Sequence, residues 1–228
     1  MKQVYAGKTK DVFALEDGNY LLQFKDEVTG EDGRIDPGSN AVLGKLEGKG
    51  KASLRMSQYF FELLQKKGIP THYVAADPKE GTMVVRPAQT FGDGLEVVIR
   101  FRAFGSFLRR YGRYAQELQP LDALVEITLK DDERGDPPLN EETLIQLNLM
   151  TGEEVTRVKT MARQVACVVR DDLAARGLDL VDIKFEFGRI NGDVVVIDDI
   201  SGDNMRVFRN KQPLLPLELS AIVTGEPV

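Results

Sequence analysis

The segment DIKFEFGRINGDVVVIDD, residues 182–199, constrains the fold more than any other part of the sequence. Its two apolar runs are separated by Asn191 and Gly192, a dipeptide typical of a β-hairpin turn. Because alternate residues of a strand share one face, the first run has a charged face and an apolar face. The charged face carries Asp182, Lys184 and Glu186, and the apolar face carries Ile183, Phe185 and Phe187. We expect the apolar face to pack against a core and the charged face to carry chemistry.

The loop length decides which residues of the two strands face each other. A two-residue Asn-Gly loop would place Glu186 opposite Ile197 and Asp198 opposite an apolar residue, which mismatches both faces. A three-residue loop, 191–193, would pair Phe187 with Ile197 and Glu186 with Asp198. We expect the three-residue loop, because it matches the apolar residues and brings two carboxylates together.

Two facing carboxylates indicate a cation site. They repel each other and raise one pKa unless a cation lies between them, and Mg²⁺ is usually held by one or two carboxylates plus phosphates. The hairpin therefore predicts a magnesium-nucleotide site at Glu186 and Asp198, with Lys184 beside it as a positive charge. The alternative is a solvated outer face with alternating charges. The run VVVIDD, residues 194–199, favours the metal site, because it is too apolar for an exposed edge strand.

The composition limits the classes of function. The chain has 228 residues, 42% of them apolar, and its net charge of −6 argues against a broad nucleic-acid surface or a membrane partner. One cysteine and one histidine exclude an internal disulfide, a zinc cluster and a histidine-based triad. No stretch resembles a signal peptide or a membrane span. We expect a cytoplasmic protein whose catalysis depends on carboxylates, lysines, arginines and hydroxyls.

The first part of the chain, residues 1–90, is expected to form a small β-rich lobe with one helix. Short β-prone segments, separated by Gly, Asp or Pro, occur near residues 3–6, 11–15, 19–25, 71–76 and 82–86. The polar stretch 26–51 is either mobile or functional, because long loops in compact lobes are uncommon. Apolar residues at helical spacing predict a helix over residues 52–68.

The second part, residues 91–228, is expected to form a larger lobe of mixed helices and strands, with FGDG at 91–94 as the hinge. Residues 96–104 and 124–130 are predicted strands. Thr151 and Glu154 form a capping box before a helix that ends at Gly177. We expect this helix to cover the hairpin.

Several further stretches have groups suited to anions. The turn in VYAGKTKDVF carries Gly7, Lys8 and Lys10, whose amides and ammonium groups can hold phosphates; a plain basic hairpin is the alternative. RFRAFGSFLRR, 100–110, combines guanidinium and hydroxyl donors, and its alternative is a neutralised strand-to-helix junction. SGDNMR, 201–206, follows the hairpin directly and is expected to deliver Asp203 and Arg206 to the side of Asp198.

These pieces together resemble the SAICAR synthetase (phosphoribosylaminoimidazole-succinocarboxamide synthase) family of purine biosynthesis. The matching stretches, in family order, are AGKTKDVF, GKGKASLRMSQYFFELL, EVVIRFRAFGS, KDDERGDPPLNEE, LVDIKFEFG and DDISGDNMR. They span residues 3–206. The resemblance implies an α+β, two-lobed fold, with a small antiparallel β lobe that binds ATP as protein kinases do and a larger α/β lobe.

The resemblance also implies a reaction and its site. The family joins the carboxylate of an aminoimidazole ribonucleotide to the amine of aspartate, using ATP and Mg²⁺ to activate the carboxylate as an acyl phosphate. The implied partners are therefore small-molecule substrates, and a homo-oligomer is compatible with the sequence. The implied nucleotide-binding residues are Gly7, Lys8, Lys10 and Arg86, and the implied metal ligands are Glu186 and Asp198. The implied substrate-binding residues are Arg100, Ser106, Asp203 and Arg206, and the implied catalytic residues are Lys130, Asp136 and Lys184.

The sequence departs from the family pattern at a few positions. Phe101 stands where the family usually has Asn, and Gly202 stands where it usually has Pro. The C-terminal segment lacks the family's usual basic, aromatic continuation, and Arg209 is a candidate substitute for its arginine. Two alternatives therefore stay open: a divergent ligase that uses another amine or carboxylate, and a nucleotide-binding homologue without turnover.

Overall fold

The computed structural model describes residues 1–39 and 41–226, and their strands form three antiparallel sheets. The first sheet has the order β1-β2-β3-β8-β7. Its strands are β1 (Lys2–Ala6), β2 (Lys10–Ala14), β3 (Tyr20–Phe24), β7 (Tyr73–Asp77) and β8 (Thr82–Val85). All five short strands expected in residues 1–90 are therefore confirmed, within one to two residues at their ends.

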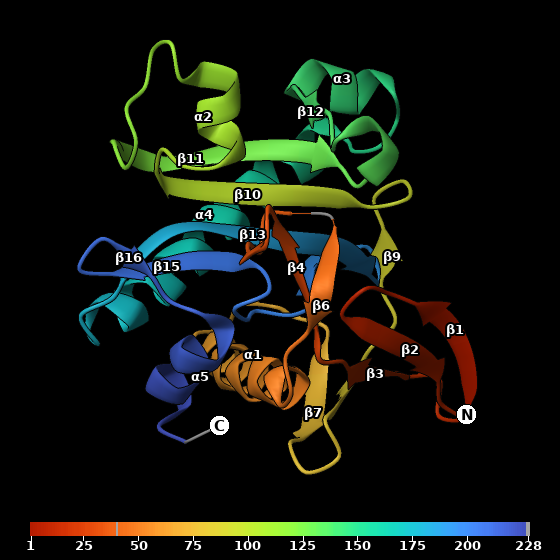
Figure 1. Cartoon of the computed structure of the whole chain (residues 1–228). Coiled ribbons are helices and arrows are strands. Elements are labelled where there is room, and N and C mark those ends of the chain that lie inside the picture. The colour runs from red at the N-terminus through yellow and green to blue at the C-terminus, as the bar shows by residue number, and fades with distance from the viewer. Residues whose placement is uncertain (40, 227–228) are drawn as a thin grey trace.

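The largest sheet runs across the upper half of the molecule (Figure 1). Its path is β12-β11-β10-β13-β15-β16, and β9 and β14 each pair with β13. These strands are β9 (Gln89–Thr90), β10 (Leu95–Arg102), β11 (Pro120–Leu129), β12 (Pro138–Leu139), β13 (Asp179–Ile190), β14 (Asp193–Ile197), β15 (Met205–Arg209) and β16 (Gln212–Pro213). The hairpin strand β13 is thus central, with neighbours on both sides. The two strands expected at 96–104 and 124–130 are β10, which pairs with β13, and β11, which pairs with β10.

The polar stretch 26–51 forms a third, three-stranded sheet, which the sequence did not predict. Its strands are β4 (Glu27–Glu31), β5 (Arg34–Ile35) and β6 (Val42–Lys45), and Asn40 lies outside the described residues. These strands lack clear alternation and contain Gly30 and Gly44, so their pattern resembles a loop. Figure 1 shows β4 and β6 standing upright in front of the largest sheet.

Helices cover the sheets from two sides. They are α1 (Lys49–Lys66), α2 (Ser106–Tyr111), α3 (Glu141–Gln146), α4 (Gly152–Ala174) and α5 (Pro216–Thr224), with a short 3₁₀ turn at Asp132–Arg134. The long helix α4 packs against β13, β10, β11 and β14, as expected, while α1 and α5 lie side by side below the sheet (Figure 1). The helix predicted over 52–68 is confirmed as α1, which begins a few residues earlier.

The loop of the hairpin differs from the expected one. The register pairs Ile190 with Asp193 and Glu186 with Ile197, so the loop has two residues, and the three-residue prediction was wrong. Asn191 and Gly192 both have positive φ angles, 54° and 88°, the backbone that a tight hairpin turn requires. The apolar match still exists on the buried face, where Phe187 is opposite Val196.

The core forms one continuous cluster that includes residues of the first sheet, the largest sheet and helices α1, α4 and α5. Both sides of the proposed hinge contribute, for example Leu22 and Met83 before it and Ile183 and Val223 after it. The division into lobes at residue 90/91 stays a prediction. In the described part of the chain, no helix is long and apolar enough to cross a membrane.

The capping box of α4 is confirmed and is held by an ion pair. Thr151 Oγ1 accepts from Glu154 N–H, the Glu154 carboxylate accepts from Thr151 N–H, and Arg189 of β13 also donates to that carboxylate. The hydrogen bond from Arg189 is the main reason why the pKa of Glu154 falls to about 2. The cap therefore also fastens α4 to the hairpin.

This arrangement makes Glu154 an acid-sensitive contact. A carboxyl group whose folded pKa lies below its ordinary value stabilises the fold at neutral pH and stops doing so as the pH falls toward that pKa. We expect Glu154→Gln to lower the free energy of unfolding by about 1 to 2 kcal/mol at pH 7, and the difference to shrink as the pH falls from about 4.5 to about 2. Urea denaturation measures both. Glu153→Gln, on the exposed neighbour in the same turn, is the control, and an equal loss there would contradict the prediction.

Candidate active site

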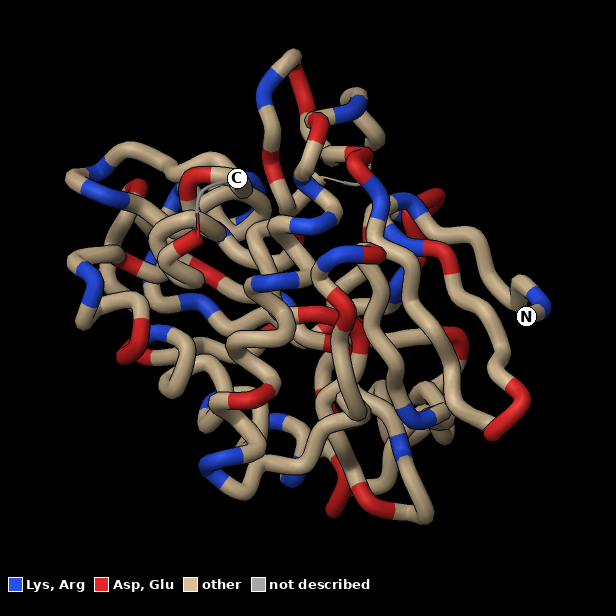
Figure 2. Tube along the Cα trace, turned by 90° about the horizontal axis from the view of Figure 1, so that it is seen from below, with Lys and Arg blue, Asp and Glu red and all other residues tan. Residues whose placement is uncertain are grey.

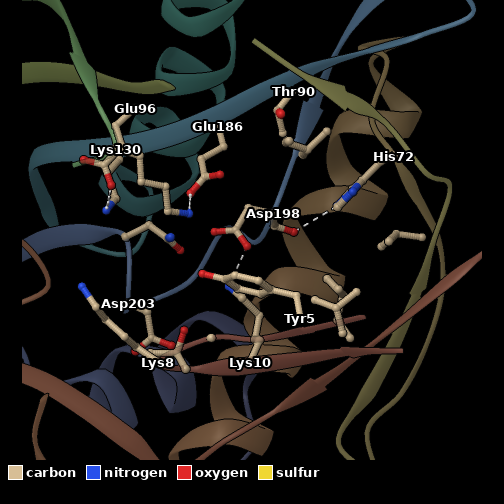
Figure 3. A pocket seen from close by; sticks show the side chains of 18 of the residues that line it. Tyr5, Lys8, Lys10, His72, Thr90, Glu96, Lys130, Glu186, Asp198 and Asp203 are labelled. Atoms are coloured by element: carbon tan, nitrogen blue, oxygen red, sulfur yellow. Dashed lines mark hydrogen bonds and ion pairs between the residues drawn. The ribbon is translucent and has the colours of Figure 1, made fainter. Parts of the chain in front are cut away.

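A cavity of about 530 Å³ lies where the first sheet, the largest sheet and the 26–51 stretch meet. Figure 3 shows its charged side chains pointing toward one another from different elements, with Asp198 in the middle. Lys8 and Lys10 come from the first hairpin, Lys130 from the end of β11, and Glu186 from β13. Elsewhere, Figure 2 shows acidic and basic positions interspersed over the whole trace. The charge pattern of the hairpin thus belongs to a concave site.

Asp198 is presented to the cavity by an unusual backbone. Strand β14 ends at Ile197, and Asp198 has a φ of 67°, a conformation that non-glycine residues rarely adopt. The chain therefore turns at Asp198, which is why its carboxylate reaches the same cavity as Glu186 although the two are not paired in register. The expectation that both carboxylates share one site is compatible with the structure, but the turn, rather than the strand pairing, brings them there.

Lys10 lies between two carboxylates. Its ammonium group is 2.8 Å from Asp198 Oδ1 and also pairs with Asp199, which is buried. Burial alone would lower the pKa of Lys10, but the two carboxylates outweigh burial and raise it above its ordinary value. For Asp198, burial raises the pKa, and Lys10 and Lys130 outweigh it, so its pKa lies well below the usual range. At neutral pH, Lys10 is therefore a fixed cation and Asp198 a fixed anion.

Glu186 has a different electrostatic environment. Its carboxylate is 2.6 Å from Lys130 Nζ, yet burial and the nearby Asp198 charge raise the pKa of Glu186. On the same face, Lys184 Nζ is 2.6 Å from Glu96 Oε1, and Glu96 outweighs burial to raise the pKa of Lys184. Lys130 thus compensates the Glu186 carboxylate only in part, and a further cation would relieve the remaining repulsion between Glu186 and Asp198.

This donor set fits Mg²⁺. Two carboxylates, Glu186 and Asp198, line one cavity, and burial together with the charge of Asp198 raises the pKa of Glu186 despite the lysine beside it. Among residues 1–39 and 41–226, no three His, Cys, Asp or Glu side chains gather as a metal cluster. Mg²⁺ commonly keeps its waters and takes one or two carboxylates plus phosphate oxygens, so two carboxylates suffice for a metal that arrives with a nucleotide.

The glycine in the first hairpin permits a tight turn beside the lysines. Gly7 N–H donates to Lys10 O at 2.8 Å, and a Cβ added at Gly7 would lie 2.7 Å from that oxygen. Only glycine therefore allows this turn to close. Gly7, Lys8 and Lys10 all line the cavity, as the phosphate-binding prediction requires, and Lys8 pairs with Asp132 across it.

One part of the same cavity is apolar. Val12, Leu22, Val85 and Ile197 line it, with Tyr5 and Tyr20 beside them. Ile197 projects there because the two-residue loop places it on the same face as Glu186, which explains the apparent mismatch in the hairpin register. A planar heterocycle fits such a surface, with charged groups at the opposite end for phosphates.

A second cavity, of about 370 Å³, adjoins the first. The two share a wall that consists of Pro37, Ser39, Glu96, Lys184 and Asn204. Arg100, Ser106, Asp136 and Arg206 all line the second cavity. Asp136, whose φ is 50°, accepts a hydrogen bond from Asp131 N–H. Three of the four predicted substrate-binding residues thus line the second cavity, and the predicted nucleotide-binding residues line the first. The two cavities meet at Lys184.

Two guanidinium groups of this second cavity, those of Arg100 and Arg206, donate to the same carboxylate. Asp182 Oδ2 accepts from Arg100 Nη1 at 2.9 Å and from Arg206 Nη1 at 2.8 Å, and Arg100 also donates to Ser106 Oγ at 2.8 Å. Asp36 accepts two further hydrogen bonds from Arg206. This network holds both guanidinium groups in fixed positions beside the cavity.

Of the thirteen predicted site residues, all line one of the two cavities. The first cavity receives Gly7, Lys8, Lys10, Arg86, Lys130, Glu186, Asp198 and Asp203; the second receives Arg100, Ser106, Asp136 and Arg206; Lys184 lines both. Asp203 accepts from Lys49, which is completely buried, and from Ser53. Arg86 donates to Thr71 O at the rim of the first cavity. Their proximity is a finding, whereas their individual roles stay predictions.

Sequence reasoning missed several residues that hold or line the site. Asp182 was recognised only as part of the charged face, and Asp36 and Lys49 lie in the polar stretch and the helix start, where no pattern separates them from solvated charges. Thr128 was not considered; it lines the second cavity, and its side-chain oxygen is buried without a hydrogen-bond partner among the described residues. The apolar neighbours of Thr128 in β11 were the only available signal of burial.

The departures from the family pattern lie away from the cavities. Phe101 is buried on the opposite face of β10 from Arg100, with Arg170 of α4 5.0 Å from its ring. A Cβ at Gly202 would lie 3.1 Å from Pro216 Cα, so α5 approaches the backbone closely there. Arg209 is exposed at the end of β15 and is absent from the described lining of both cavities. Phe101 and Gly202 are thus explained by packing.

Comparisons with known proteins agree with this architecture. The family model described as SAICAR synthetase matches residues 3–214. The chain is 52% identical over 225 residues to the phosphoribosylaminoimidazole-succinocarboxamide synthase of Clostridium tetani, covering 98% of this chain and 99% of that protein. Among solved structures, a SAICAR synthetase (type 2) in complex with ADP has a TM-score of 0.88 at 29% identity, covering 98% of both chains. A SAICAR synthetase from Pyrococcus horikoshii OT3 has a TM-score of 0.84 at 28% identity, covering 96% of this chain and 99% of the other.

Proposed function

Because this chain belongs to the SAICAR synthetase family, an ATP-dependent ligase family of purine biosynthesis, we propose that it joins the carboxylate of carboxyaminoimidazole ribonucleotide to the amine of aspartate, giving SAICAR, ADP and phosphate. The observation that carries the proposal is the continuity of the two cavities at Lys184. A phosphoryl donor in one space and a carboxylate acceptor in the other would meet there. The full-length match to the Clostridium tetani synthase supports this substrate choice over a divergent one.

The first cavity suits ATP. Its apolar part, which includes Leu22, Val85 and Ile197, offers a surface for the adenine, and the turn at Gly7–Lys10 offers amides and ammonium groups for the phosphates. The ADP complex of a related synthetase supports a nucleotide here. Glu186 and Asp198 would hold Mg²⁺, which neutralises phosphate charge when bound. Lys10 and Lys130 now pair with these carboxylates and would pair with the nucleotide phosphates once the metal is bound.

The second cavity suits the ribonucleotide. Arg206 and Arg100 present guanidinium groups, and Ser106 presents a hydroxyl, a donor set that matches a phosphate monoester. Asp136 also lines this space, and Asp203 adjoins Asn204 in the shared wall, where an amine could be received. These positions support the substrate roles that the family resemblance implies.

The proposed reaction has two steps. The substrate carboxylate oxygen attacks the γ-phosphorus of ATP, the bond to the bridging oxygen breaks, and an acyl phosphate and ADP form. The aspartate amine then attacks the acyl carbon, loses a proton, and expels phosphate as the amide bond forms. Lys184, at the junction, would stabilise the negative charge that develops on the transferred group. An enzyme nucleophile is not required, since the acyl phosphate is itself the activated intermediate.

The remaining features follow from this function. We propose two lobes, 1–90 and 91–228, that face each other across the nucleotide cavity, and a cytoplasmic location, where the small-molecule substrates of purine biosynthesis are made and used. The partners would be small molecules, without nucleic acid or membrane, and a homo-oligomer is compatible with the chain.

The proposed reaction is tested by ADP release with Mg²⁺, ATP and carboxyaminoimidazole ribonucleotide, with and without aspartate, followed by mass analysis of the product. Aspartate-dependent ADP release together with a succinocarboxamide product supports the proposal. Nucleotide binding without this product, while another amine releases ADP, would replace it with a divergent ligase. ADP release with the carboxylate alone would instead indicate a kinase.

Thr128 provides a test of the acceptor cavity. Its hydroxyl is buried without a partner among the described residues, so a bound substrate would satisfy it. We expect Thr128→Val to leave the free energy of unfolding unchanged or higher, and to raise the KM for the ribonucleotide by up to about tenfold through loss of one hydrogen bond. Steady-state kinetics and urea denaturation measure the two effects. Thr156→Val, on the exposed face of α4, is the control, and an unchanged KM in Thr128→Val would remove this residue from the site.

A further inference from the structure

The single histidine of the chain contacts the backbone of Asp198. His72 is 5% exposed, lines the first cavity and has its Nε2 3.0 Å from the backbone oxygen of Asp198 (Figure 3). It is the only histidine in the sequence, and neither the family motifs nor the proposed chemistry gives it a role. Its side chain contacts the backbone of a proposed metal ligand, so its function has to be explained through that residue.

Asp198 needs an external restraint. Its φ of 67° is unfavourable for a residue with a β-carbon, and such conformations persist only where the surroundings hold them. If the chain relaxed to an extended conformation, the alternation of strand β14 would turn the Asp198 side chain toward the opposite face, away from Glu186. The position of the carboxylate in the cavity therefore depends on whatever fixes this turn.

The segment around His72 supplies that restraint. His72 N–H donates to Val196 O, and Val196 N–H donates to Pro70 O, so residues 70–72 run beside β14 as an extra, parallel neighbour. Arg86 N–H in turn donates to His72 O, which ties the same segment to the end of β8. The imidazole thus stands on a backbone that is fixed on both sides, and it reaches the first residue after the end of β14.

We propose that His72 is a positioning residue: its Nε2–H donates to Asp198 O and holds the left-handed turn that presents the Asp198 carboxylate to the metal of the nucleotide. The inference rests on the proposed function only in assigning a Mg²⁺-nucleotide to this cavity. The alternative is that His72 is a packing residue, since its ring lies 5.6 Å from that of Phe61. The two interpretations differ in whether the N–H of the ring matters.

The chemistry of the contact assigns the donor. A carbonyl oxygen can only accept a hydrogen bond, so the ring nitrogen 3.0 Å from Asp198 O must carry a proton.

The first test uses the unmodified chain, without an affinity tag. Because there is one histidine, ¹⁵N-labelled histidine gives a single pair of ring nitrogen signals. At pH 7, we expect the neutral Nε2–H tautomer, with a proton attached to Nε2 and none on Nδ1. A neutral Nδ1–H tautomer would overturn the proposal, because Nε2 could then not donate to Asp198 O.

The second test compares two variants of the same position. His72→Phe keeps the ring and its contact with Phe61 but has no donor, whereas His72→Gln replaces the ring with an amide N–H donor. Binding of Mn²⁺ in the presence of ADP, followed by electron paramagnetic resonance, measures the metal site without turnover. We expect His72→Phe to raise the Kd for Mn²⁺ by about 10- to 100-fold, as for other lost outer-shell hydrogen bonds, and His72→Gln to restore most of it. ADP affinity without metal, measured in parallel, separates a loss of the metal site from a loss of nucleotide binding.

The outcomes separate this proposal from the proposed function. Equal Mn²⁺ affinity in wild type and His72→Phe would overturn the positioning role, and so would an equal loss in His72→Phe and His72→Gln, which would indicate packing. If His72→Phe does not fold, the tautomer measurement and His72→Gln still decide. Failure of the proposed reaction would appear instead as missing succinocarboxamide product in a wild-type protein whose Mn²⁺ binding still depends on His72.

Discussion

Replacing Asp198 by Asn is expected to lower kcat by about 10²- to 10⁴-fold, the range that corresponds to several kcal/mol of lost charge stabilisation by a metal-held phosphate. Asn keeps the shape of the side chain and tolerates the positive φ at this position, so the turn is retained. The main change is therefore the loss of one negative charge facing the nucleotide. Lys10 keeps Asp199 as a partner, which limits the effect on stability.

The measurement is ADP release at saturating ATP over a range of Mg²⁺ concentrations, together with nucleotide binding with and without Mg²⁺. We expect Asp198→Asn to lose the magnesium-dependent part of ATP affinity. The charge reversal Asp198→Lys should abolish it. Asp193→Asn, an exposed acid at the start of the same strand, is the matched control and should behave like wild type. Unchanged magnesium dependence in Asp198→Asn would contradict the assignment of a metal ligand to the hairpin.

Replacing Asp182 by Asn is expected to lower the free energy of unfolding by about 3 kcal/mol, because removing one member of a buried ion network leaves charges without compensation. Asp182 is 3% exposed and its Oδ2 accepts from Arg100 and Arg206. Without its charge, two adjacent guanidinium groups would repel each other and keep only Glu126 and Asp36 as partners. We also expect the KM for the ribonucleotide to rise, since both groups would leave their fixed positions.

Urea denaturation and steady-state kinetics measure the two consequences. The control is Asp179→Asn, at the beginning of the same strand, where the carboxylate pairs with Arg102 at the surface. An exposed pair of this kind contributes less than about 1 kcal/mol. Similar losses in the two variants would show that burial of the Asp182 network does not have the effect we assign to it. A stable Asp182→Asn protein with unchanged KM would remove the network from the site.

Most of the regular structure could be predicted because its signals are local. The strands of the first sheet and of the hairpin alternate or are strongly apolar, and the capping box of Thr151 and Glu154 marks the start of α4 directly. The strands β4 to β6 could not be predicted in the same way. Their residues are polar and glycine-rich, and β4 and β6 stand in front of the largest sheet, from which they are distant in sequence (Figure 1).

The predicted site residues line two adjoining cavities, but the geometry of those cavities was not predictable from the sequence. Glu186 and Asp198 were expected to face each other through a three-residue loop, and the structure has the two-residue loop instead. Possible strand registers can be compared from the hairpin sequence alone. The turn at Asp198 cannot be predicted in this way, because it depends on contacts from residues 70–72. Glu186 and Asp198 therefore line the same cavity although the predicted register was wrong, because the turn at Asp198 directs its carboxylate there.

The sequence by itself determined the charged and apolar faces of the hairpin, the helices that cover it and the family motifs, because periodicity, caps and turn residues act over a few neighbouring positions. Only the tertiary structure decided which charges lie in a cavity and which lie in solvent. Lys10 and Asp199 are 189 positions apart, and Arg206 and Asp36 are 170 apart. Such pairs form when sheets pack against each other, and burial then decides whether a charge is held in place or free.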